Sequence, residues 1–115
     1  MADIFPTIPC PDAISGFAWV YVLQSADGAF YIGQTVNLRE RLRKHRLGLG
    51  SKHTEDHAGT RLIYCDGPFL PEKAVQREAQ LKGWSRAKKE ALIRGDYEAI
   101  RQLSKRARQT TTTAP

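Results

Sequence analysis

A single carboxylate occupies the centre of what the sequence predicts to be an apolar helix face. Glu78 lies three or four residues from each apolar residue of a predicted helix over residues 71–82; these apolar residues are Ala74, Val75 and Leu81. Desolvating an unpaired carboxylate costs several kcal/mol, so Glu78 requires a cation, hydrogen bonds or a raised pKa. A functional role is one explanation. The alternatives are an ion pair with Arg41 or Lys82, or a helix face that is less buried than the pattern indicates.

A fixed cation and a titratable ring stand one helical turn apart. Arg41 and His45 lie one above the other on a predicted helix, beside the apolar stripe of Leu38 and Leu42. An arginine can hold a phosphate with two hydrogen bonds, and a histidine can donate or shuttle a proton near neutral pH. The alternative for His45 is a half-buried ring that packs on leucine.

Two tyrosines fall in predicted strands on either side of a turn. If residues 27–28 form a tight two-residue turn, Tyr21 and Tyr31 point to opposite sides of the sheet. If residues 26–28 form a three-residue loop, with its glycine in the left-handed conformation, both tyrosines share one face. Parity alone favours neither a shared site nor anything beyond ordinary strand aromatics.

Two other residue groups do not sustain a metal or phosphate interpretation. His53, His57 and Cys65 supply three potential zinc ligands, but their segment is broken by glycines and is more simply a polar loop. Residues 48–52 lack the spacing of a phosphate-binding loop and follow no strand. Cys10 and Cys65 are predicted to be reduced thiols, because two distant cysteines make no disulfide framework.

The elements that position these residues follow from patterning and turn signals. Three prolines predict an extended N-terminal arm over residues 1–15. Aromatic and β-branched runs predict strands, Asn37 with Glu40 begins a helix, and Gly95 ends another. The expected ranges are strands 17–24, 29–34 and 61–66, an exposed loop 48–59, helices 37–47, 71–82, 86–94 and 96–106, and a disordered tail 107–115. The element order is β-β-α-β-α-α-α.

Composition limits the class of protein. The chain has 115 residues, 41% of them hydrophobic and 26% charged, which is typical of one soluble globular domain, here expected over residues 16–106. Eighteen Lys and Arg against twelve Asp and Glu make a net charge of +6 and indicate an anionic partner. The longest apolar run, residues 17–23, is too short to span a membrane, and residues 1–12 lack a secretion signal, so we expect a cytoplasmic protein.

Four motifs in order carry a resemblance to a known family. They are Trp19-Val20-Tyr21, Tyr31-Ile32-Gly33, Asn37-Leu38-x-x-Arg41-Leu42-x-x-His45, and Glu78. Over about residues 17–104 the chain resembles the GIY-YIG endonuclease superfamily. It is most similar to small stand-alone members that resemble the nuclease domain of the bacterial excision-repair endonuclease, and residues 77–89 match the signature of that subgroup. The first motif departs from its name, with tryptophan and valine where glycine and isoleucine are usual.

The resemblance implies an α/β (α+β) fold with a three-stranded antiparallel sheet flanked by helices. It also implies that both motif tyrosines line one site, which settles the parity question. Residue by residue, the implied site consists of the tyrosines Tyr21 and Tyr31, the motif glycine Gly33, the phosphate-binding Arg41, the helix histidine His45, the metal-binding Glu78 and, in the position of a further histidine, His53. The later asparagine of the family has no clear counterpart here.

The expected function is a Mg²⁺- or Mn²⁺-dependent DNA endonuclease that works as a monomer in DNA repair or recombination. Basic residues then supply phosphate contacts without sequence information, so structure-selective or weakly sequence-selective cutting is expected. These residues are Arg39, Arg43, Lys44, Arg46, Lys82, Arg86, Lys88 and Lys89. The rival hypotheses are a non-catalytic nucleic-acid-binding module and a nuclease subunit that needs a protein partner.

Overall fold

A computed structural model describes residues 3–46 and 59–112. Its strands β1 (Ala18–Gln24), β2 (Phe30–Thr35) and β3 (Arg61–Phe69) form an antiparallel sheet in the order β2-β1-β3. Its helices are α1 (Leu38–Arg46), α3 (Pro71–Lys82), α4 (Arg86–Arg94) and α5 (Tyr97–Thr112). The fold class and the element order are therefore those that the sequence predicts. The chain divides into two compact units, Met1–Lys82 and Gly83–Pro115.

The hairpin between β1 and β2 decides which tyrosines share a face. The Ser25 amide donates to the Ala29 carbonyl over 3.0 Å, and Gly28 has a φ of 92°, so residues 26–28 form a three-residue loop. Tyr31 consequently pairs with Leu23 rather than with the next residue of β1. Because side chains alternate along a strand, Tyr21 and Tyr31 lie on the same face of the sheet. The three-residue alternative is confirmed.

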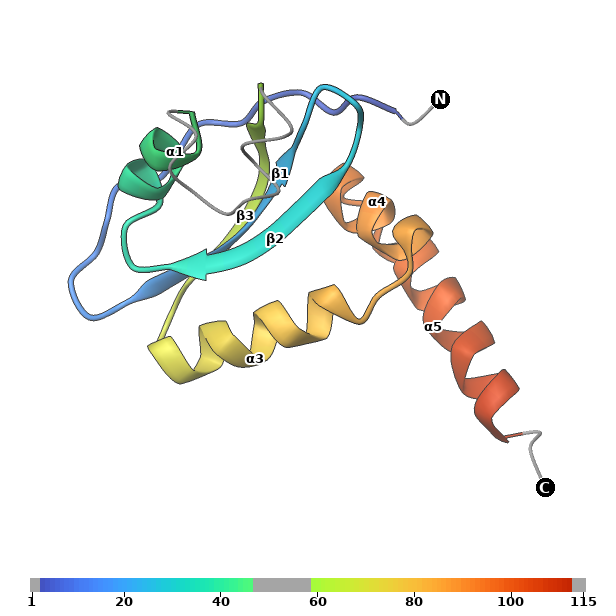
Figure 1. The fold of residues 1–115 in the computed structure, drawn as a ribbon. Helices are drawn as coiled ribbons and strands as arrows, with labels where there is room; N and C mark the ends of the chain where they lie inside the picture. Colours follow the sequence, from blue (N-terminus) through green and yellow to red (C-terminus); the bar gives the residue numbers. More distant parts are fainter. Residues whose placement is uncertain (1–2, 47–58, 113–115) are drawn as a thin grey trace. The chain divides into compact units, whose positions relative to one another are not determined.

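Helix α1 is capped and buried as its sequence indicates. The Asn37 side chain accepts a hydrogen bond from the Glu40 amide at 3.1 Å, which supplies a partner to one of the amides left open at a helix start. The Glu40 carboxylate does not complete the expected reciprocal cap with Asn37: it accepts two hydrogen bonds from Arg43. Leu38 is fully buried in a core cluster with Trp19, Tyr21, Leu23 and Leu62. Figure 1 shows α1 above the strands and α3 below them.

The N-terminal segment, residues 3–15, packs along the first unit without regular secondary structure. The Ile8 amide donates to the Leu62 carbonyl at 3.0 Å, beside the otherwise open edge of β3. Buried Gln24 accepts from the Phe5 amide at 2.8 Å and donates to the Asp3 carbonyl at 2.7 Å. Covering an edge strand in this way removes a template for pairing with another chain.

Helix α3 shows where the predicted apolar face was wrong. Ala74 and Leu81 are fully buried, but Val75 is 52% exposed. Successive helical residues are turned by about 100° from one another, so Val75 falls off the face that Ala74 presents to the sheet. The buried face of α3 is therefore narrower than the sequence pattern indicated, and Glu78 stands beside it rather than at its centre.

The second unit consists of α4 and α5. The Ser85 side chain caps α4 by accepting from the Lys88 amide at 3.2 Å, and Gly95 ends it in the left-handed conformation with a φ of 74°. Asp96 caps α5 through the Ala99 amide at 3.1 Å. Helix α5 runs to Thr112 and not to the expected end near residue 106, because no glycine or proline interrupts residues 106–112. No helix in the described ranges is long and apolar enough to cross a membrane.

Candidate active site

Tyr21 and Gly33 form the floor of the candidate site. They are directly paired across β1 and β2, and Tyr21 is 3% exposed. A Cβ atom added to Gly33 would lie 2.6 Å from Tyr21 Cζ, well inside van der Waals contact. The absence of a side chain at this position is therefore what allows the phenol ring to lie across β2. This close approach gives the motif glycine a physical reason that needs no unusual backbone angle.

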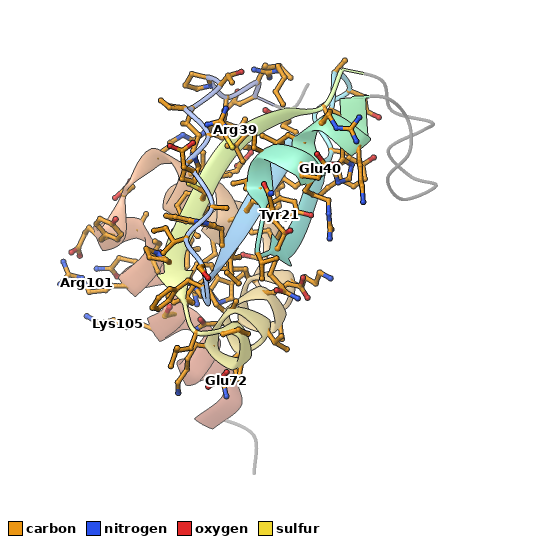
Figure 2. The ribbon with its side chains drawn as sticks, turned by 90° about the vertical axis from the view of Figure 1, so that its left-hand side faces the viewer. Tyr21, Arg39, Glu40, Glu72, Arg101 and Lys105 are labelled. Atoms are coloured by element: carbon orange, nitrogen blue, oxygen red, sulfur yellow. The ribbon has the colours of Figure 1, made fainter. Side chains whose placement is uncertain are left out.

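Arg41 connects helix α1 to that phenol. Its Nη1 donates a hydrogen bond to Tyr21 Oη at 3.1 Å. Burial raises the pKa of Tyr21 above 10.0, the Arg41 guanidinium opposes this rise, and Glu78 adds to it through its negative charge. At neutral pH the phenol consequently keeps its proton while its oxygen accepts a hydrogen bond from a cation. Figure 2 shows Tyr21 beside α1.

Glu78 brings helix α3 to the same place. Its side chain is 24% exposed, and Lys82 Nζ lies 3.4 Å from its Oε1. This ion pair with Lys82 is one of the alternatives that the sequence left open, and it supplies the cation that a partly buried carboxylate requires. Since Glu78 is near enough to Tyr21 to affect its pKa, three separate elements place a phenol, a guanidinium and a carboxylate in one neighbourhood.

Tyr31 and His45 flank this group differently. Tyr31 shares the face of Tyr21 and packs, half-buried, against the core cluster under α1. His45 is 9% exposed, and neither ring nitrogen has a hydrogen-bond partner among the described residues. Burial, and secondarily the charge of Arg41, lowers the pKa of His45 below 6.5, so the ring is neutral at pH 7. Its placement corresponds to a packed ring that supports α1, the alternative that the sequence left open.

A metal ion in this neighbourhood would have one protein carboxylate. No group of three or more His, Cys, Asp or Glu residues in the described part of the chain is arranged to hold a metal. Glu78 alone suits Mg²⁺ or Mn²⁺, because Mg²⁺ prefers hard oxygen ligands and is commonly bound by one or two carboxylates together with substrate phosphates and waters. A closed, all-protein site such as structural zinc requires does not fit these residues.

The predicted phosphate-contacting residues of the first unit have varied surroundings. Arg39 is paired with Asp12 at 2.8 Å, and Arg43 with Glu40 at 2.7 Å. Lys44 is exposed, and Lys82 is the partner of Glu78 described above. Both His53 and the side chain of Arg46 lie outside the described residues.

The predicted contacts of the second unit all lie on α4. Arg86 is exposed and contacts Glu90 at 3.4 Å, one turn along the helix. The Lys88 ammonium lies 4.2 Å from the centre of the Trp84 ring, a cation–π arrangement. Lys89 is half-buried. Helix α4 thus presents cations on a short, well-capped helix.

One positioning contact was not predicted from the sequence. Arg77 Nε donates to Asp66 Oδ2 at 3.1 Å and so ties α3 to β3. The pair lies beside Tyr64, whose pKa is raised to about 12 by burial and by the charge of Asp66. Because Arg77 precedes Glu78, this partly buried ion pair helps to set the position of the carboxylate. No local signal indicates it, since its partners belong to different elements.

Comparisons with known proteins identify relatives of this chain. A family model described as the GIY-YIG catalytic domain matches residues 17–91. A UPF0213 protein of Streptococcus pneumoniae is 41% identical over 76 residues, which cover 66% of this chain and 77% of that protein. A UPF0213 protein of Natronomonas pharaonis is 39% identical over 75 residues, covering 65% and 88%. The solution NMR structure of a UPF0213 protein from Bacillus halodurans has 36% identity, covers 76% of this chain and 97% of its own, and superposes with a TM-score of 0.45.

Proposed function

This chain belongs to the GIY-YIG family, and from that premise we propose that it is a divalent-metal-dependent endonuclease that hydrolyses phosphodiester bonds of DNA. Family membership implies nuclease activity. The observation that carries the proposal is the hydrogen bond of 3.1 Å between Arg41 and the buried phenol of Tyr21, with Glu78 close enough to act on the same phenol. A module that only binds nucleic acid has no use for that combination.

Arg41 binds and neutralises the scissile phosphate in this proposal. A guanidinium has five N–H donors in a planar fork, and the hydrogen bond to Tyr21 uses Nη1. The remaining donors face a phosphate from a fixed position, because the bond to a buried phenol orients the side chain. Donors that are held in place before the reaction stabilise developing phosphoryl charge more effectively than mobile ones.

Tyr21 handles the proton of the attacking water, with Tyr31 as its partner on the same face. The phenol is protonated at neutral pH because burial raises its pKa, and Arg41 is the neighbour that favours its ionised form. A phenol that exchanges its proton beside a guanidinium can act as a general base or as a relay. Gly33 contributes by leaving room for the ring.

Glu78 would hold the metal, as Mg²⁺ or Mn²⁺. When bound, such an ion would polarise the scissile phosphate and stabilise the leaving oxygen. Lys82 neutralises the carboxylate in the structure at 3.4 Å and, being 55% exposed, can move into solvent without being left buried and unpaired. Glu78 therefore combines a protected position with an exchangeable partner.

The surplus of basic residues supports DNA as the substrate. A net charge of +6, with exposed cations on α1 and α4, favours contacts with phosphates over contacts with bases. The proposal accordingly includes structure-selective or weakly sequence-selective cutting in DNA repair or recombination. It does not require a protein partner.

Replacing the carboxylate tests the proposal. The purified chain is assayed with Mg²⁺ and with Mn²⁺ on supercoiled plasmid and on branched, single-stranded and duplex DNA. We expect Glu78→Gln to lower the rate of cutting by at least about a hundredfold while DNA binding persists. Glu72→Gln is the matched control, because Glu72 is an exposed glutamate in the first turn of the same helix (Figure 2).

Two results would contradict the enzyme proposal. One is equal cutting by wild type and Glu78→Gln, which would remove the carboxylate from the reaction. The other is inactivity of the wild type on every substrate, which would favour the non-catalytic binding module if binding persists.

A further inference from the structure

The N-terminal segment builds a cavity apart from the candidate active site. This cavity has a volume of about 310 Å³ and lies between the segment, the outer side of α1 and the start of β3. Its apolar lining is formed by Ile8, Leu42 and Leu62. The GIY-YIG match begins at residue 17, so the segment that forms one wall lies outside the matched family domain.

Helix α1 separates the cavity from the candidate active site. Residues two positions apart on a helix are turned by about 200°, so Arg39 and Arg41 leave α1 on opposite sides of its buried stripe. Arg41 reaches Tyr21, whereas Arg39 Nη2 donates to the Cys10 carbonyl at 3.2 Å and to Asp12 at 2.8 Å. Figure 2 shows Arg39 between α1 and the N-terminal segment.

Two guanidinium groups line this cavity from different elements. Arg39 comes from α1, and Arg61 begins β3. Arg61 Nη1 donates to the Phe5 carbonyl at 3.0 Å and to Thr7 Oγ1 at 3.1 Å, so one terminal nitrogen makes both of these bonds. Each guanidinium has five N–H donors, and the bonds described here use Nη2 of Arg39 and Nη1 of Arg61. Both cations are thus fixed in place by the segment and retain donors for an anion.

The charge and shape of the lining indicate the class of ligand. Asp12 offsets the charge of Arg39, which leaves the lining net positive through Arg61. The hydroxyls of Thr7 and Thr60 add polar groups to the lining. A small inorganic anion would leave the apolar lining without a partner. A flat ring carrying a phosphate would cover it, because arginine both stacks on rings and binds phosphate in two-point fashion.

We propose that this cavity binds a nucleoside monophosphate, either free or as the terminal nucleotide of a DNA strand. The ring packs against Ile8, Leu42 and Leu62, and the phosphate is bound by Arg39 and Arg61. The volume of about 310 Å³ is at the lower end of ordinary small-ligand sites, as a single nucleotide requires. The site is additional to the proposed nuclease centre and involves no metal.

Cys10 gives a direct readout because its side chain also lines the cavity. The full chain carrying Cys65→Ser, which leaves Cys10 as the thiol, is treated with iodoacetamide in the presence of EDTA. The probes are deoxyadenosine monophosphate, a short oligodeoxynucleotide with a 5′-phosphate, and inorganic phosphate. We expect the nucleotide, the oligonucleotide or both to slow alkylation of Cys10, and inorganic phosphate to have little effect.

Substitutions then assign the protection to the cavity. Affinities are measured by calorimetry, and Arg39→Gln and Arg61→Gln should each weaken binding by about tenfold or more, the loss expected for one charge-assisted contact. Arg43→Gln, the same change on the exposed side of α1, should leave the affinity unchanged. Ile8→Trp fills the cavity and should abolish binding. Thermal unfolding confirms that each variant is folded.

The outcomes separate the sources and the alternatives. Protection by the free nucleotide alone identifies a small-molecule site, and protection by the oligonucleotide alone identifies a strand-end site. Equal protection by inorganic phosphate, no protection by any probe, or affinities unaffected by both arginine substitutions would overturn the proposal. Because EDTA is present and Glu78→Gln should bind as wild type does, failure here is distinguishable from failure of the nuclease proposal.

Discussion

The two sides of helix α1 carry the same chemical group in opposite environments. Arg41 donates to the phenol of Tyr21, which is 3% exposed, whereas Arg39 is paired with Asp12, whose side chain is 89% exposed. An exposed ion pair contributes about 0–1 kcal/mol, because water screens it and both side chains lose freedom. A hydrogen bond to a buried group holds its partner in place and leaves a costly unpaired atom when it is removed. Exposure, rather than residue type, therefore decides which arginine is rigid.

The largest expected effect follows from weakening the buried side of α1. Arg41→Lys keeps the charge but loses the planar fork, and it should lower the rate of DNA cutting by at least about a hundredfold. Arg39→Lys, the equivalent change on the exposed side, should lower that rate by no more than about threefold, the loss of roughly one surface contact. Initial rates of plasmid nicking measure both. Equal losses would show that the two sides of α1 do not differ in the way proposed.

The next effect comes from the close approach of Tyr21 to Gly33. Gly33→Ala places a methyl group against the phenol ring, so the ring or strand β2 has to shift. Overpacking of this kind should lower the free energy of unfolding by about 1–3 kcal/mol and displace the hydroxyl from Arg41. Urea denaturation and nicking assays measure the two consequences. Wild-type stability together with wild-type activity would contradict the assigned packing.

A smaller effect is expected where the N-terminal segment is anchored. Gln24→Leu removes the side-chain bonds to Phe5 and Asp3 and should lower the free energy of unfolding by about 1–2 kcal/mol. Amide exchange of residues 3–8 should accelerate more than that of β1, because the segment loses its anchor while the strand keeps both neighbours. Uniform acceleration throughout the sheet would instead mean that Gln24 supports β1 itself.

The smallest effect is a pH dependence beneath α1. The pKa of His45 is lowered in the folded chain, so below pH 6.5 the unfolded chain binds a proton that the folded chain does not. Stability should therefore be complete above pH 6.5 and decline as the pH falls through this range. Thermal unfolding of His45→Leu at a series of pH values should show a shallower decline than wild type. Identical pH profiles would place His45 in contact with water.

Local features of this fold could be predicted from short stretches of sequence. The Asn37 cap and the glycine that ends α4 each depend on residues within one or two turns of one another. The three-residue hairpin loop was one of two local solutions, and the family resemblance selected the one observed. The exposure of Val75 and the extension of α5 to Thr112 were missed, because apolar periodicity does not measure the width of a buried face and a weak stop signal does not end a helix.

The sequence by itself determined the residue types, the element order and the face on which each strand residue lies. These depend on backbone geometry, which near neighbours control. Only the tertiary structure decided that Tyr21, Arg41 and Glu78 lie together, that Lys82 is the cation beside Glu78, and that the N-terminal segment covers β3. Those contacts join elements that are distant in sequence, and they form because burying one shared core outweighs any local preference for where each element lies.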